Sequence, residues 1–152
     1  MTKSHKKLIG LYCLVIDLPA DTKICFNKSP RLFKKGYYIY VGSALGGLFA
    51  RISRHLRINK KIYWHIDRLL DVKGAFTKTI FYLETDKKDE CRIADILKKR
   101  YQGIEGFGCS DCVCQSHLFY LGLRIDKEKE KNIKRLIGMK QIEPGNVKKL
   151  EK

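Results

Sequence analysis

Residues 8–18 are nearly continuous in apolar and aromatic side chains, and this run constrains the fold more than any other segment. It is shorter than the roughly 18 apolar residues that a membrane span requires. It also fits a secretion leader poorly, because Asp17 follows the apolar stretch at once. A run without alternation is typical of a buried strand. We therefore expect a central strand here, in a cytoplasmic protein whose thiols are reduced.

The other periodicities predict further strands and helices around this strand. Strands are expected at residues 22–26, 36–42, 76–84 and 117–125. Helices are expected at residues 48–57, 63–70, 89–101 and 126–136, the last capped by Asp126. Loops are expected at residues 28–35, around Pro30, and at residues 103–114. This order predicts an α+β fold with a small mixed β-sheet flanked by helices, with one domain over residues 1–138 and a loosely ordered basic tail over residues 139–152.

The charge of the chain predicts a polyanionic partner. Lys and Arg number 32 against 16 acidic residues, which gives a net charge of +16. A domain this basic usually binds nucleic acid; an anionic membrane surface is the second choice, and simple solvation of the surface is the third. We expect DNA as the partner and no membrane association. The side chains expected to contact phosphates are Arg54, Arg57, Lys60 and Lys61.

Four short segments concentrate reactive side chains. They are Gly10-Leu11-Tyr12, Tyr40-Val41-Gly42, the helix from Arg51 to Arg57, and Glu90 at the start of a later helix. Each has an ordinary explanation by itself: strand tyrosines pack in cores, helix arginines face solvent, and an acid in a first helical turn is favoured by the helix dipole. Arg51 and His55, however, are four residues apart and therefore share one face of their helix.

Together these segments resemble the GIY-YIG nuclease family. The resemblance rests on GLY at residues 10–12, YVGSA at 40–44 and the R-x-x-x-H pattern of Arg51 and His55. Three longer segments resemble its compact Uri-type subgroup, also known as domain of unknown function 123. They are YYIYVGSALGGLFARISRHLR at 37–57, WHID at 64–67 and GFGCSDCVCQSHLFY at 106–120.

The resemblance implies a metal-dependent DNA endonuclease that hydrolyses phosphodiester bonds with one divalent cation, Mg²⁺ or Mn²⁺. Tyr12 and Tyr40 would lie side by side and face the scissile phosphate, and one of them, or a water it orients, would be the general base. Glu90 would bind the metal, and Arg51 would contact the phosphate as negative charge develops. His55 and His65 would assist proton transfer or phosphate positioning.

The chain departs from the family pattern in two ways. Leu11 and Val41 replace isoleucines within the two motifs, and these are exchanges between apolar residues. The asparagine that many members place late in the domain has no recognisable counterpart. Ser110, Gln115 and His117 are the alternatives for its position.

A cysteine-rich segment offers a possible metal site or a structural cluster. Cys109, Cys112, Cys114 and His117 are ligand types that zinc accepts. Zinc sites usually use two well-separated ligand pairs, whereas this group is crowded into one segment. We therefore favour a tight loop of buried thiols over zinc, with His117 in the active site as a further alternative. Cys13 and Cys25 lie in expected strands and are interpreted as core residues.

Two other functions compete with the nuclease. One is a non-catalytic nucleic-acid-binding module with the same fold, which the joint presence of Tyr12, Tyr40, Arg51 and Glu90 disfavours. The other is a zinc-stabilised RNA-binding protein built around residues 109–117. No segment identifies a protein partner or a targeting domain.

Overall fold

A six-stranded sheet runs through the middle of the molecule. The structure is a computed structural model, and it describes residues 6–151. Its strand order is β6-β7-β4-β1-β5-β8. β1 (Gly10–Leu18) lies at the centre, between β4 (Gly36–Ala44) and β5 (Phe76–Glu84). The outer strands are β7 (Leu118–Gly122), β6 (Gln102–Gly103) and β8 (Lys140–Ile142).

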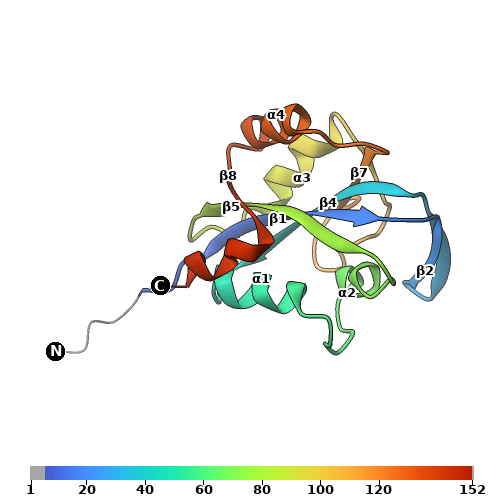
Figure 1. Ribbon diagram of the computed structural model, residues 1–152, viewed down its shortest axis with the longest axis horizontal. Coiled ribbons are helices and arrows are strands. Elements are labelled where there is room, and N and C mark those ends of the chain that lie inside the picture. Colours follow the sequence, from blue (N-terminus) through green and yellow to red (C-terminus); the bar gives the residue numbers. More distant parts are fainter. Residues whose placement is uncertain (1–5, 152) are drawn as a thin grey trace.

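Helices cover both faces of this sheet (Figure 1). On one face lie α1 (Leu48–Leu56) and α2 (His65–Leu70). On the other face lie α3 (Glu90–Lys98) and α4 (Lys127–Ile137). α4 begins as expected, because the Asp126 carboxylate accepts a hydrogen bond from the Lys129 amide at 2.8 Å. Among residues 6–151, no helix has the length and the apolar character that a bilayer span needs.

β1 is buried on both faces, as the apolar run predicted. Leu11, Cys13 and Val15 face the core under α3 and α4, whereas Tyr12, Leu14 and Ile16 face the core under α1 and α2. The α+β class is confirmed, because helices pack on both faces of the sheet. The expectation of a mixed sheet is wrong, because every strand pairing in the described residues is antiparallel. Hydrophobic periodicity shows which faces of a strand are buried, but it carries no information on strand direction.

Residues 28–35 do not form the expected loop. β2 (Thr22–Phe26) and β3 (Ser29–Phe33) make a separate hairpin, in which Phe26 pairs with Ser29. Asn27 and Lys28 form its two-residue turn with φ angles of 52° and 61°, the left-handed pair that a type I′ turn requires. Pro30 had argued for a loop, but a two-stranded sheet consists only of edge strands, where proline is tolerated.

The expectation of a loosely ordered tail is wrong for residues 139–151. β8 pairs with β5, and a 3₁₀ helix, η1 (Pro144–Leu150), follows it. Leu150 is 3% exposed, and Val147 packs against the same core as α1. Pro144 and Gly145 suggested disorder, yet proline also suits the first turn of a helix, where its missing N–H is not needed. Long-range packing of a few apolar side chains orders this segment, and local sequence does not reveal such packing.

Candidate active site

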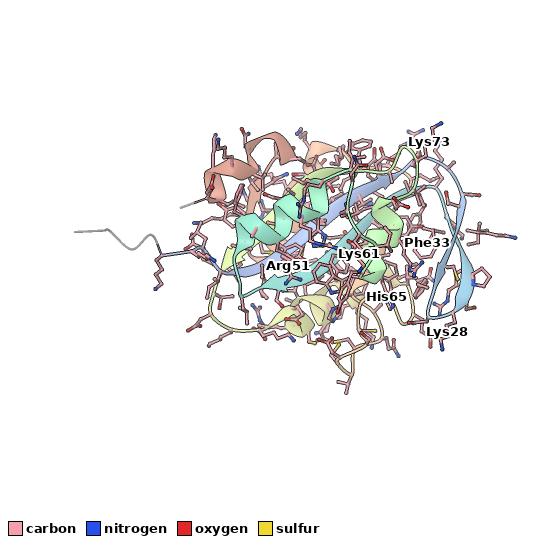
Figure 2. All side chains as sticks on the ribbon, turned by 90° about the horizontal axis from the view of Figure 1, so that it is seen from below. Lys28, Phe33, Arg51, Lys61, His65 and Lys73 are labelled. Carbon is pink, nitrogen blue, oxygen red and sulfur yellow. The ribbon has the colours of Figure 1, made fainter. Side chains whose placement is uncertain are left out.

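A cavity of about 670 Å³ lies where α1, α2 and the start of α3 meet the strands β1 and β4. It gathers nearly all the residues that the family resemblance had selected. Those that line it are Tyr12, Tyr40, Arg51, His55, His65, Glu90, Ser110 and His117. Figure 2 shows Arg51, Lys61 and His65 on the side of the molecule that α1 and α2 cover. Gln115, one alternative for the late asparagine, does not line this cavity.

The two motif tyrosines lie diagonally on adjacent strands. Tyr12 pairs with Gly42, and Leu14 pairs with Tyr40, so both tyrosines project from the same face of the sheet. Their ring centroids are 6.4 Å apart. A Cβ atom at Gly42 would come within 2.5 Å of the Tyr12 hydroxyl and Cζ atoms. Gly42 in the second motif therefore has to be a glycine, because the ring of Tyr12 in the first motif fills the space that a side chain would need.

Tyr12 is hydrogen-bonded to a buried, neutral histidine. Its hydroxyl lies 2.7 Å from His55 Nε2, and both residues are 2% exposed. Burial lowers the pKa of His55 to about 3. Burial also raises the pKa of Tyr12 and Tyr40 above their ordinary value, and the nearby Arg51 charge offsets only part of this rise. The pair therefore consists of a protonated phenol and a neutral imidazole.

Arg51 presents a charged group to the cavity. Its guanidinium lies over the Trp64 ring, with Cζ 4.4 Å from the ring centroid, a cation–π contact. Within residues 6–151, no ion pair engages Arg51. The planar fork of this side chain is thus available for an anion such as a phosphate.

Glu90 places a carboxylate in the cavity wall. It is only 8% exposed, and its Oε2 atom is buried without a hydrogen-bond partner in the structure. The nearest cation is the Lys88 ammonium, 4.0 Å from Oε1. An unpaired buried carboxylate oxygen is costly. A bound cation would satisfy it.

His65 connects α2 to the loop before β7. Its Nδ1 accepts a hydrogen bond from the Gly108 amide at 2.9 Å. Its ring packs against Phe26 and Phe107, at centroid distances of 5.2 and 5.6 Å. Burial lowers the pKa of His65. Because Nδ1 is an acceptor, the neutral ring carries its proton on Nε2 and can donate it to a ligand.

Arg54 and Lys60, two of the expected DNA contacts, have their charged groups occupied inside the protein. The Arg54 guanidinium makes two bonds to the Asp67 carboxylate, at 2.9 and 3.0 Å. The Lys60 ammonium donates to the carbonyls of His55 and Arg57, at 2.8 and 2.7 Å, and so caps the end of α1. Both residues belong to the scaffold. The other two, Arg57 and Lys61, are exposed.

Asp67 was overlooked in the sequence, although it organises the joint between α1 and α2. It is fully buried and also accepts hydrogen bonds from the amides of Tyr63 and Trp64. Burial raises the pKa of its carboxyl, but the bonds from Arg54 and these amides outweigh that effect and hold the pKa below its ordinary value. Its position gave a weak signal, because an acid in the first turn of a helix can accept hydrogen bonds from the amides that precede it.

A cysteine and histidine cluster adjoins the cavity, with a different membership from the one expected. Its members are Cys91, Cys112, Cys114 and His117. Cys109 lies outside it, with its thiol donating to the Gln115 carbonyl at 3.6 Å. The expected set was therefore wrong in one position. Cys91 comes from α3 and is distant in sequence, so the spacing of the loop cysteines gave no signal for it.

The two strand cysteines differ in their environments. Cys13 is completely buried, as expected. Cys25 is exposed, so its interpretation as a core residue is wrong. It alternates on β2 with the buried residues Ile24 and Phe26 and therefore points to the other side of the hairpin.

The fold and the cavity define an α+β domain with a polar site walled by aromatic rings. The matching family model is described as "Domain of unknown function DUF123" and covers residues 11–138, from β1 through α4. The chain belongs to this family. No curated protein and no solved structure matches it. All the cavity residues named above fall within the matched range.

Proposed function

We propose that the protein is a GIY-YIG-type DNA endonuclease of the Uri kind, which hydrolyses phosphodiester bonds with one Mg²⁺ or Mn²⁺ ion. The observation that supports this most is Glu90, whose buried and unpartnered Oε2 atom lies in the wall of the same cavity as Arg51. A cation site beside a free guanidinium is a suitable combination for a phosphate group.

The donor set fits a hard divalent cation. Mg²⁺ is commonly held by one or two carboxylates together with substrate phosphates and water. Glu90 supplies one carboxylate, and Asp111, which is exposed, also lines the cavity. Bound there, the ion would polarise a phosphoryl oxygen and stabilise the leaving oxygen.

The cavity side chains can perform the remaining steps. Arg51 binds the phosphate through its planar fork and stabilises charge that develops during hydrolysis. Tyr12, held by the 2.7 Å contact between its hydroxyl and His55 Nε2, accepts a hydrogen bond from the attacking water and orients it, while a second water takes up the proton. Neither Tyr12 nor His55 then carries a charge, which burial disfavours in both side chains. His65 donates from Nε2 to a phosphate oxygen.

The charge of the chain and the family resemblance support DNA as the substrate. The net charge of +16 favours a polyanion. Arg57 and Lys61 lie exposed beyond the end of α1 and can contact phosphates of the DNA backbone. Contacts of this kind position a duplex without reading its sequence.

The test is Glu90→Gln, assayed on supercoiled, linear and branched DNA with and without Mg²⁺. Cleavage should fall by about 100-fold or more, because the residue that holds the ion is lost. DNA binding should persist, and the midpoint of thermal unfolding should hardly change. Asp89→Asn is the matched control, since it removes the same charge one residue earlier, where the side chain pairs with Arg92 outside the cavity. This control should cleave at the wild-type rate.

The outcomes separate the nuclease from a binding module. If the wild-type protein binds DNA in a salt-dependent manner but cleaves none of these substrates in Mg²⁺ or Mn²⁺, it is a non-catalytic binder. If Glu90→Gln cleaves at the wild-type rate, Glu90 is only a helix-terminal acid and the mechanism above is wrong.

A further inference from the structure

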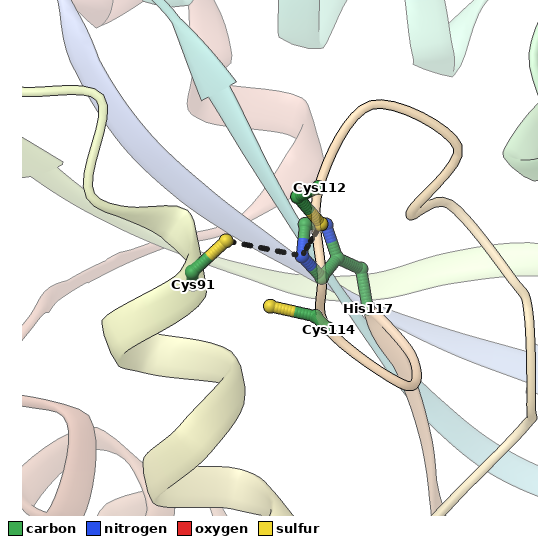
Figure 3. A group of neighbouring side chains, drawn as sticks. All are labelled: Cys91, Cys112, Cys114 and His117. Carbon is green, nitrogen blue, oxygen red and sulfur yellow. Dashed lines mark hydrogen bonds between the residues drawn. The ribbon is translucent and has the colours of Figure 1, made fainter.

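Three thiols and an imidazole meet beside the cavity without being used by the proposed hydrolysis. Cys91 lies in the first turn of α3, whereas Cys112, Cys114 and His117 belong to the loop that leads into β7 (Figure 3). Their ligand atoms all lie within 4.8 Å of one another. None of the three cysteines forms a disulfide.

Two distances within the cluster match those of a tetrahedral zinc site, and all its ligand atoms lie within 4.8 Å of one another. With Zn–S near 2.3 Å and Zn–N near 2.0–2.1 Å, a tetrahedron places its nitrogen and sulfur ligands about 3.6 Å apart and its sulfurs about 3.8 Å apart. His117 Nε2 lies 3.5 Å from the Cys112 sulfur and 3.8 Å from the Cys91 sulfur. The side chains are therefore arranged around a common centre before any ion is considered.

The chemistry of the donors selects the metal. Three thiolates and an imidazole suit Zn²⁺, whereas Mg²⁺ and Ca²⁺ require oxygen ligands. All four tetrahedral positions are supplied by protein side chains, which is the arrangement of a structural site rather than a catalytic one. The crowding that argued against zinc in the loop sequence alone is relieved by Cys91. This residue approaches from a separate element, 26 residues away from His117 in sequence.

We infer that Cys91, Cys112, Cys114 and His117 bind one structural Zn²⁺ ion, which fastens the first turn of α3 to the loop before β7. The cluster adjoins Glu90, the residue immediately before Cys91, and His117 also lines the cavity. The ion thus holds in place the helix end that presents the Glu90 carboxylate. This inference is independent of the nuclease activity, because it concerns only the four ligands.

The experiment compares Cys91→Ser with Cys109→Ser in the full chain, purified in a reducing buffer. Cys109 is a matched control, since it lies in the same loop but outside the cluster. Metal content is measured by mass spectrometry, and zinc affinity by competition with a chromogenic chelator. The wild-type protein and Cys109→Ser should each hold one zinc per chain. Cys91→Ser should bind zinc more weakly by a factor exceeding the roughly 10–100-fold that loss of an outer-shell partner costs.

Cobalt substitution gives a readout that does not depend on stability alone. Co²⁺ in the wild-type site should show thiolate charge-transfer absorption and the visible bands of tetrahedral cobalt. Cys91→His, which retains four ligands, should keep the tetrahedral bands and lose part of the thiolate absorption. This variant also tests the site if Cys91→Ser fails to fold. A strong chelator should lower the thermal midpoint of the wild-type protein and of Cys109→Ser by several degrees.

Three results would overturn the inference. The first is a wild-type protein that holds no metal and gives no cobalt–thiolate absorption after reconstitution. The second is loss of zinc in Cys109→Ser together with its retention in Cys91→Ser, which would place the site in the loop alone. The third is stoichiometric iron in place of zinc.

Discussion

Two arginines of α1 lie over the same tryptophan but belong to different parts of the molecule. The guanidinium carbons of Arg51 and Arg54 are 4.4 and 4.3 Å from the centroid of the Trp64 ring. Arg51 lines the cavity, whereas Arg54 is paired with the buried carboxylate of Asp67. Two residues of one type, three positions apart, thus serve the site and the scaffold respectively.

Lys60 and Lys61 differ in the same way, one belonging to the scaffold and the other facing solvent. Lys60 donates to two carbonyls at the end of α1, and the adjacent Lys61 is exposed. Residues 51–61 are therefore not a uniform phosphate-binding surface. Two of these four charged groups are bound within the fold, so net charge overstates the number of side chains that are free to contact DNA.

The largest expected effect comes from replacing the two arginines in turn. Arg54→Ala should lower the free energy of unfolding by about 3 kcal/mol, because it leaves Asp67 buried without its partner. Arg51→Ala should change the free energy of unfolding by less than about 1 kcal/mol, which is the size of an exposed cation–π contact. Arg51→Ala should instead lower DNA cleavage by about 100-fold, with little loss of affinity. Urea unfolding and single-turnover cleavage measure the two effects. Equal destabilisation by both variants would contradict the assignment of Arg54 to the scaffold and of Arg51 to the site.

His55 does not fit this separation of site residues from scaffold residues, because it lines the cavity and is also buried like a core residue. Its pKa is lowered from 6.5 to about 3 by burial. The unfolded chain therefore binds a proton below pH 6.5 that the folded protein rejects. The stability that depends on neutral His55 is fully present above pH 6.5 and is lost as the pH falls toward 3, at up to about 1.4 kcal/mol per pH unit.

His55→Gln isolates this contribution. The difference in unfolding free energy between the wild-type protein and His55→Gln should shrink by about 2 kcal/mol between pH 6.5 and pH 5, because glutamine does not titrate. Denaturant titrations at several pH values measure this difference. If the difference is the same at every pH, His55 is accessible to protons in the folded state and the assigned burial is wrong.

The smallest expected effect concerns the two lysines. Lys61→Ala should weaken DNA binding slightly and reduce the slope of log affinity against log salt by about 1, the share of one phosphate contact. Lys60→Ala should leave that slope unchanged and cost up to about 1 kcal/mol of stability, because it removes a cation from the C-terminal end of α1. Fluorescence anisotropy at several salt concentrations gives the slopes. A lower slope in Lys60→Ala would show that, in the wild-type protein, the Lys60 ammonium leaves these carbonyls and contacts a DNA phosphate.

Local sequence patterns were sufficient for the longer strands and helices of the domain, but not for β3, β8 and η1. The expected strand at residues 76–84 has the bounds of β5, and the expected strand at 22–26 has those of β2. Strong apolar periodicity and turn residues define such segments without reference to the rest of the chain. The resemblance likewise selected Tyr12, Tyr40, Arg51 and Glu90, which the structure brings to one cavity.

The features that sequence did not predict depend on contacts between distant segments. Cys91 joins the thiol cluster only because α3 packs beside the loop that precedes β7. Arg54 was expected on DNA because its partner, Asp67, lies on another helix. The ordering of residues 139–151 depends on Leu150, which reaches the core beneath α1. Periodicity describes the face of one element and does not show what that face meets.

Trp64 is the only tryptophan in the chain, and it lies in the cavity wall with the Arg51 guanidinium over its ring. If a phosphate group binds Arg51 as proposed, it should change the surroundings of the one indole that the protein contains. The intrinsic tryptophan fluorescence of the unmodified protein should therefore report on the cavity. It should allow ligand occupancy to be followed in real time, without a label and without turnover.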